Sequence, residues 1–144
     1  MVRILLSLLA LPLLFVQLKP AQRPSVLVPV TGPKVLFFEP TQVERDSIIR
    51  VDGMEMAQLF DDFDYNAARA SGFVKARGIP VQVTSNPELM VRLETGVIRK
   101  FERKFFADVV GVLLTDGVQE PRLLPGMLTE EELIAEFTSF FRLQ

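Results

Sequence analysis

The chain contains no cysteine and no histidine. Without cysteine it has no disulfide, no thiolate nucleophile and no zinc–thiolate site. Without histidine it has neither a Ser-His-Asp triad nor an imidazole metal ligand. It also lacks a Gly-rich phosphate loop and a dinucleotide fingerprint, so we expect no cofactor and no metal. Any catalysis would have to depend on carboxylates, lysine, the single tyrosine or a Ser/Thr hydroxyl.

The chain also has no large excess of charge of either sign. The 144 residues include 16 Lys and Arg against 18 Asp and Glu, which gives a formal net charge of −2. This balance predicts no nucleic-acid partner, because nucleic-acid-binding domains are usually strongly basic. A hydrophobic content of 49% indicates a globular chain that can bury a core.

The N-terminus is the most apolar part of the chain. Arg3 precedes an almost unbroken apolar run over residues 4–16. A basic start and a run of this length predict a signal peptide or N-terminal anchor over residues 1–21, since a membrane span needs about 20 apolar residues. We therefore expect export to the periplasm or the medium, with weak membrane association where the segment stays uncleaved. The alternative is a buried core helix, which Pro12 disfavours.

The rest divides into a Pro-rich linker or edge strand over residues 22–33 and an α/β domain over residues 34–144. An apolar run predicts a strand at 34–38, and the turn signal Asp52-Gly53 indicates a second strand at 47–51. Residues 79–84 alternate apolar and polar side chains, which predicts a strand whose buried face contains Ile79, Val81 and Val83. A helix is expected over residues 54–77, with an apolar face formed by Leu59, Phe63, Ala67, Ala70 and Val74.

The second half has stronger local signals. Asn86-Pro87-Glu88 predicts the start of another helix, and a further helix is favoured over a strand at 97–106. A strand follows at 109–115, then a turn at Asp116-Gly117 and a short return strand at 121–125. Thr129 begins a capping box that predicts a final helix. Its apolar face contains Leu133, Ile134, Phe137, Phe140 and Phe141.

This order of elements, with "LLTDG" followed by "GMLTEEEL", resembles the thioredoxin-like fold family. The resemblance implies a central mixed β-sheet flanked by helices and a C-terminal β-hairpin plus amphipathic helix. The family's Cys-x-x-Cys is replaced here by Glu39-Pro40-Thr41-Gln42, and its cis-proline by residues 108–110, Asp-Val-Val. The chain would therefore be a non-redox member that lacks both elements of the thiol chemistry.

In such a fold the loops at residues 39–42 and 107–109 would meet at one end of the sheet, where α/β folds present ligands. We therefore expect a groove for an extended segment of a protein partner. Its candidate residues are Glu39, Thr41, Gln42, Phe106 and Val109. The alternative is that this end only closes the domain.

Two other motifs are weaker. Residues 61–66 begin like a calcium loop but lack its glycine and final glutamate, which favours a solvated acidic helix. The cations at 99–104 are more simply a solvated face than a membrane-surface patch.

These observations predict a non-catalytic exported module that binds another protein or supports an envelope assembly. The alternative is a small carboxylate-dependent hydrolase of the cell envelope that uses Glu39 and an aspartate from residues 61–64.

Overall fold

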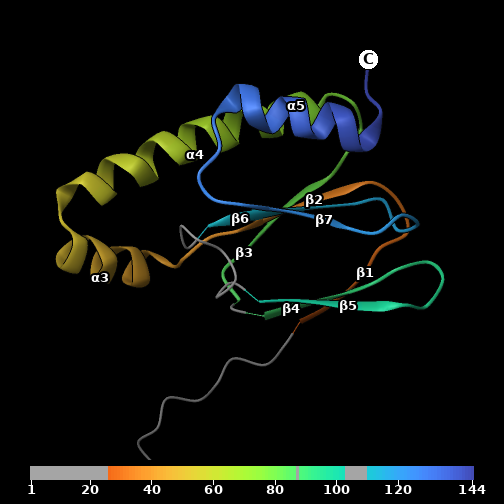
Figure 1. Cartoon of the computed structure of the whole chain (residues 1–144), viewed down its shortest axis with the longest axis horizontal. Helices are drawn as coiled ribbons and strands as arrows, with labels where there is room; N and C mark the ends of the chain where they lie inside the picture. Colours follow the sequence, from red (N-terminus) through yellow and green to blue (C-terminus); the bar gives the residue numbers. More distant parts are fainter. Residues whose placement is uncertain (1–25, 87, 103–109) are drawn as a thin grey trace, which may run out of the picture.

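The computed structural model describes residues 26–86, 88–102 and 110–144, and within these ranges the chain forms seven strands and three helices. Together they make a mixed α/β fold with two sheets (Figure 1). In chain order the elements are β1 (Val26–Pro29), β2 (Lys34–Phe38), α3 (Gln42–Asp52), α4 (Met54–Lys75), β3 (Val81–Thr84), β4 (Glu88–Arg92), β5 (Ile98–Glu102), β6 (Gly111–Thr115), β7 (Arg122–Pro125) and α5 (Glu130–Phe141).

The larger sheet has four strands in the order β3-β2-β6-β7. β2 pairs parallel with β3 and antiparallel with β6, which in turn pairs antiparallel with β7. β2 is the apolar run that the sequence predicts, and its last four residues are fully buried. A continuous apolar run suits a strand covered on both faces.

The two faces of this sheet are covered differently. Helices α4 and α5 lie over one face, and the second sheet lies against the other (Figure 1). Val35 and Phe37 of β2 point into the helical core, while Leu36 and Phe38 point into the core between the sheets. The expectation of a sheet flanked by helices is therefore correct for one face only.

The second sheet has three strands in the order β1-β4-β5. β1 is an edge strand that pairs parallel with β4, and β4 and β5 form an antiparallel hairpin that turns at Gly96 with φ of 86°. The helix predicted to start at Asn86-Pro87-Glu88 is wrong, because Glu88–Arg92 is a strand. The helix favoured at 97–106 is wrong over Ile98–Glu102, and residues 103–106 lie outside the described ranges.

Two helices separated by Gly53 connect β2 to β3. The predicted strand at 47–51 is wrong, because these residues belong to α3. Gly53 has φ of 94°, a left-handed conformation that ends α3 and allows α4 to start in a new direction. The prediction of a long helix from Met54 is confirmed, but its buried face contains Phe60 and not Leu59, which is 47% exposed.

The C-terminal part agrees with the sequence analysis. β6 and β7 form the expected hairpin, and Thr129 and Glu132 make a reciprocal capping box at the start of α5. Leu133, Phe137 and Phe140 are buried against the helical core, and Ile134 and Phe141 pack at its margin.

The predicted signal segment at residues 1–21 lies outside the described ranges. Within those ranges, no helix has both the length and the apolar character needed to cross a bilayer.

Candidate binding site at the end of β2 and along β3

Glu39 directly follows β2 at the point where β2 and its parallel neighbour β3 both end. Its backbone N–H donates to the carbonyl of Thr84 at 2.9 Å, which extends the pairing of the two strands by one residue. The C-terminal ends of parallel strands are a common place for ligand sites in α/β folds. Glu39 therefore lies where the resemblance to the thioredoxin-like fold family would place the first residue of the Cys-x-x-Cys motif.

The next residues start a helix. The side chain of Thr41 accepts a hydrogen bond from the backbone N–H of Glu44 at 3.2 Å and so caps α3. The backbone N–H of Arg45 donates to the Thr41 carbonyl at 2.9 Å. This first turn places the Arg45 side chain beside the end of β2 and beneath α4.

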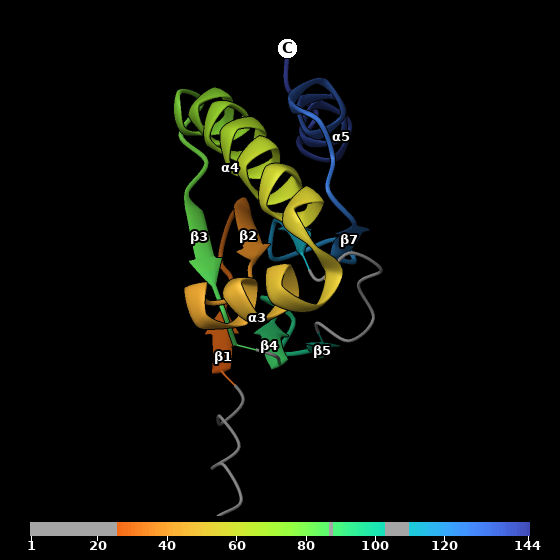
Figure 2. The same ribbon diagram turned by 90° about the vertical axis from the view of Figure 1, so that its left-hand side faces the viewer.

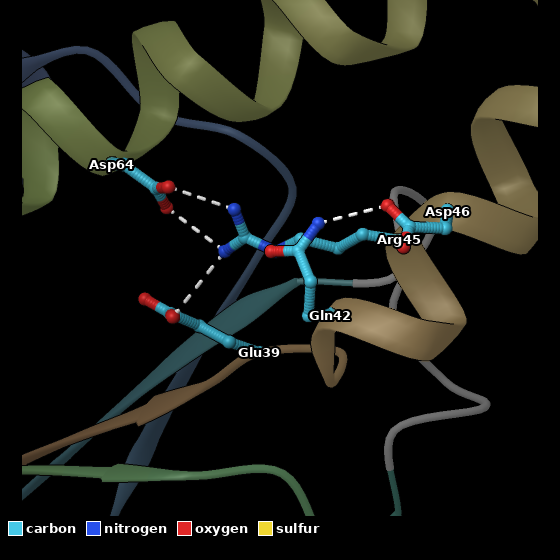
Figure 3. A network of polar contacts seen from close by, with 5 residues as sticks. All are labelled: Glu39, Gln42, Arg45, Asp46 and Asp64. Atoms are coloured by element: carbon cyan, nitrogen blue, oxygen red, sulfur yellow. Dashed lines mark hydrogen bonds and ion pairs between the residues drawn. The ribbon is translucent and has the colours of Figure 1, made fainter.

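Arg45 links three elements (Figure 3). Its Nη1 and Nη2 donate to the two carboxylate oxygens of Asp64 on α4, at 2.7 and 2.9 Å. Nη2 also lies 3.4 Å from Oε2 of Glu39. The Arg45 side chain is only 11% exposed, and its Cζ lies 4.9 Å from the centre of the Phe60 ring. A two-pronged contact of this kind fixes geometry more strongly than a single ion pair.

Burial and the neighbouring charges shift the pKa of Glu39. It raises the pKa of the Glu39 carboxyl, Asp64 raises this pKa further by charge repulsion, and Arg45 opposes both. The hydrogen bond to Asp64 in turn raises the pKa of the Arg45 guanidinium, which keeps it charged. Two carboxylates thus come together, as the hydrolase alternative requires, but a guanidinium occupies the space between them.

A groove runs from this cluster along β3. It has a volume of about 400 Å³ and lies between α4 and the helix-facing side of β3. Glu39, Asp64 and Val83 line it at one end, and Lys75 lines it together with Val81 and Ser71. We call this hollow, defined by these six residues, the β3 groove. Small residues of α4, Ala67 and Ala68, leave the room for it.

β3 is also the outer strand of its sheet, as its place at the margin in Figure 2 shows. Val35 N–H donates to the Pro80 carbonyl, and Glu39 N–H donates to that of Thr84, so the even-numbered residues of β3 face β2. Backbone groups of successive strand residues point in opposite directions. Those of Val81 and Val83 therefore point away from β2, and no strand in the described ranges pairs with them.

Of the three candidate residues that the structure describes, Glu39, Thr41 and Gln42, only Glu39 lines the β3 groove. Thr41 caps α3, and Gln42 donates to Asp46 at 2.8 Å on the exposed side of the same helix. Phe106 and Val109 lie outside the described ranges. A binding role for these four residues stays a prediction.

The sequence analysis did not identify Arg45 or Val83. One signal for Arg45 was available, since Thr41-x-x-Glu44 has the spacing of a helix N-terminus. Val83 was expected to face a core, yet it is 59% exposed. Its position at the sheet margin depends on strand order, which no local pattern reveals.

Residues 61–66, which begin like a calcium loop, lie within α4 and cannot wrap around an ion. In the part of the chain that the structure describes, no group of acidic side chains is arranged to hold a metal ion.

Comparison with family models, with curated proteins and with solved structures finds no match to this chain.

Proposed function

We propose that this protein is a non-catalytic, thioredoxin-like module that acts outside the cytoplasm and holds another polypeptide chain along its β3 edge. The observation that carries the proposal is that two features occur side by side. An outer strand presents the backbone groups of Val81 and Val83, and an apolar groove with charged ends runs beside it. Strand addition uses such an edge for affinity and the neighbouring pockets for specificity.

The Arg45 contacts favour binding over hydrolysis. A hydrolase that uses two carboxylates needs one as an acid and one as a base or nucleophile, with substrate between them. Here the guanidinium of Arg45 lies between Glu39 and Asp64 and contacts both. The same ion network suits a module, because it locks α3, α4 and the end of β2 into one rigid unit beside the groove.

The strand arrangement supports the thioredoxin-like part of the proposal. That family implies the order β3-β2-β6-β7, a helical connection between the two parallel strands, made here by α3 and α4, and a hairpin followed by a final helix. The β4–β5 hairpin, where the family would have a second helix, is a departure. The absence of cysteine from the whole sequence leaves such a scaffold without thiol chemistry.

Export rests on the sequence of the first 21 residues alone. Residues 1–30 should direct a reporter that is active only outside the cytoplasm, because Arg3 and the apolar run have the pattern of an export signal. A reporter that stays silent, with the fusion protein intact in the cytoplasm, would contradict this part of the proposal.

The binding site can be tested with a photo-reactive amino acid, p-benzoylphenylalanine, placed at Val83 of the full chain in its own cells. Val118 is the matched control, because it is a valine of similar exposure, 63% against 59%, in the β6–β7 turn. Irradiation should give a covalent adduct of discrete mass from position 83 and none from position 118. Equal adducts from both positions, or none from 83, would place the interaction elsewhere.

A further inference from the structure

We propose that the polypeptide held along the β3 edge inserts a carboxylate into the β3 groove, where it accepts hydrogen bonds from the hydroxyl of Ser71 and the ammonium of Lys75. This inference rests on the proposed function, since it names the chemistry of the segment that the same edge holds. It is carried by a buried hydroxyl without a hydrogen bond, by a lysine without an ion pair and by the position of both on one face of α4.

Ser71 brings an unpaired hydroxyl to the β3 groove. The residue is only 8% exposed and lines the groove. In the part of the chain that the structure describes, no group forms a hydrogen bond with this hydroxyl. Ser47 on α3 shows the common alternative, because its hydroxyl donates to the Val43 carbonyl one turn earlier at 3.0 Å.

The Ser71 hydroxyl is nevertheless open to the groove. Among the described residues, no side-chain oxygen or nitrogen that is closed off from solvent lacks a hydrogen bond. The Ser71 oxygen must therefore be reachable, and the groove is the hollow that its residue lines. Since a buried hydroxyl without a partner costs free energy, its partner is whatever fills the groove.

Lys75 adds a positive charge to the same face of the helix. It follows Ser71 by four residues in α4 and also lines the groove. Residues four apart are neighbours on a helix surface. Within the described ranges Lys75 forms no ion pair, in contrast to Arg45, which contacts Asp64 and Glu39. The flexible stem of Lys75 can turn its ammonium toward the Ser71 hydroxyl.

A carboxylate suits these two donors. It has two oxygens and accepts hydrogen bonds without donating any, so one group can pair with both the hydroxyl and the ammonium. Hydrogen bonds between charged groups are stronger than those between neutral groups. A side-chain amide could accept both bonds but would leave the charge of Lys75 unpaired, and a cation would be repelled.

The strand edge determines where the carboxylate lies in the bound segment. The side chains of Val81 and Val83 lie on the helix-facing side of β3 and line the groove. In a strand added to this edge, every second side chain lies on that side. Lys75 ends α4, from which the chain turns into the start of β3, so the carboxylate belongs beside Val81. An aliphatic residue two positions away would then lie beside Val83.

Sequencing the photo-adduct identifies the carboxylate and its source. The adduct that p-benzoylphenylalanine forms at position 83 of the full chain is digested and read by tandem mass spectrometry. The captured segment should contain aspartate, glutamate or its own C-terminal residue two positions from the crosslinked residue. These results distinguish an acidic side chain from a chain terminus as the source. A segment with no carboxylate at either such position would overturn the inference.

Substitutions of the two donors test the site before any partner is known. With the photo-reactive residue at position 83, Lys75→Glu brings like charges together and should lower the adduct yield about tenfold or more. Lys75→Arg keeps the charge and should retain most of the yield. Arg50→Glu is the matched control, because it changes the charge equally at an exposed residue of α3 that forms no ion pair within the described ranges.

Ser71→Ala removes the second donor and should lower the adduct yield by a smaller factor, about threefold. Ser47→Ala is its control on α3, and its yield should be unchanged. Alanine favours a helix and Lys75 is exposed, so all variants should keep the far-ultraviolet spectrum of the wild type.

The outcomes separate this inference from the proposed function. Losses in Lys75→Glu and Ser71→Ala, but not in the controls, support both. An adduct from position 83 whose yield is the same in all variants supports an interaction at the β3 edge but overturns the carboxylate site. An equal loss in Arg50→Glu also overturns it, because the effect would then belong to overall charge. No adduct at position 83 in the chain without further substitutions overturns both.

Discussion

The two outer strands of the four-stranded sheet differ in how they are protected. β7 is tied to α5, since Arg122 contacts Glu136 at 3.0 Å and lies 5.4 Å from the centre of the Phe140 ring. β3 has no comparable contact among the described residues, and its Val83 is 59% exposed beside the β3 groove. Both are outer strands, but among the described residues side-chain contacts of this kind tie only β7 to a helix. The proposed binding edge is the one beside the β3 groove.

The largest expected effect is at α5, which packs beside β7. Phe137 of α5 is fully buried, so Phe137→Ala should lower the free energy of unfolding by about 3–5 kcal/mol. That is a large share of a typical total of about 5–15 kcal/mol. Val83→Ala on the outer strand β3 should cost about 1 kcal/mol or less, because Val83 is largely exposed. Urea unfolding of both variants checks this contrast, and equal losses would mean that β3 is not an open edge.

The second effect concerns the cluster at the end of β2. Arg45→Ala removes the guanidinium that contacts both Asp64 and Glu39, so the charge of Arg45 no longer offsets the repulsion between these two carboxylates. Hydrogen bonds to charged groups suggest a loss of about 1–3 kcal/mol, at the lower end because Asp64 is 46% exposed. Arg45→Lys keeps the charge and should lose less. Indistinguishable unfolding curves for wild type and Arg45→Ala would show that the network does not hold α3 in place.

Helix caps provide a third comparison. Thr129→Ala should cost about 0.5–2 kcal/mol, because it leaves the Glu132 N–H without its acceptor on a helix that is part of the core. Thr41→Ala removes the same kind of cap from α3, which has no buried residue, and should affect global unfolding less. Serine at either position is the control. A larger effect at Thr41 would reverse the ranking of the two helices.

The smallest expected effect is on how the stability of Glu39→Gln, relative to wild type, changes with pH. Burial raises the pKa of Glu39 above its ordinary value of 4.5. A carboxyl whose pKa is raised in the folded state keeps its proton to a higher pH in the folded chain than in the unfolded chain. Its contribution to stability is therefore lost as the pH rises through the folded-state pKa. Glu39→Gln cannot ionise. The stability of this variant relative to wild type should therefore rise with pH above 4.5 and then level off. A difference that is constant or falls with pH would contradict the burial of Glu39.

The sequence predicted the elements whose signals are local. The hairpin and α5 follow from a turn glycine, a capping box and a helical spacing of apolar residues. The β4 prediction failed although Leu89, Val91 and Leu93 alternate as in a strand, and all three are buried. Asn86-Pro87-Glu88 is a good helix start, but pairing with β1, about 60 residues earlier in the chain, outweighs it.

The sequence predicted where the candidate site lies but not which contacts form it. The end of β2 was identified, and Glu39 lies there. The contact between Arg45 and Asp64, by contrast, depends on the turn at Gly53 that returns α4 over α3. The open edge of β3 depends on strand order, which is set by non-local pairing. Neither property is present in any short stretch of sequence.

The most direct test of the account is amide hydrogen exchange of β3 in the full chain. The amides of Gln82 and Thr84 face β2 and should be protected. Those of Val81 and Val83 point away from β2 and should exchange rapidly while no other chain is bound. Protection of Val81 and Val83 equal to that of Gln82 and Thr84 in the free protein would contradict an available β3 edge.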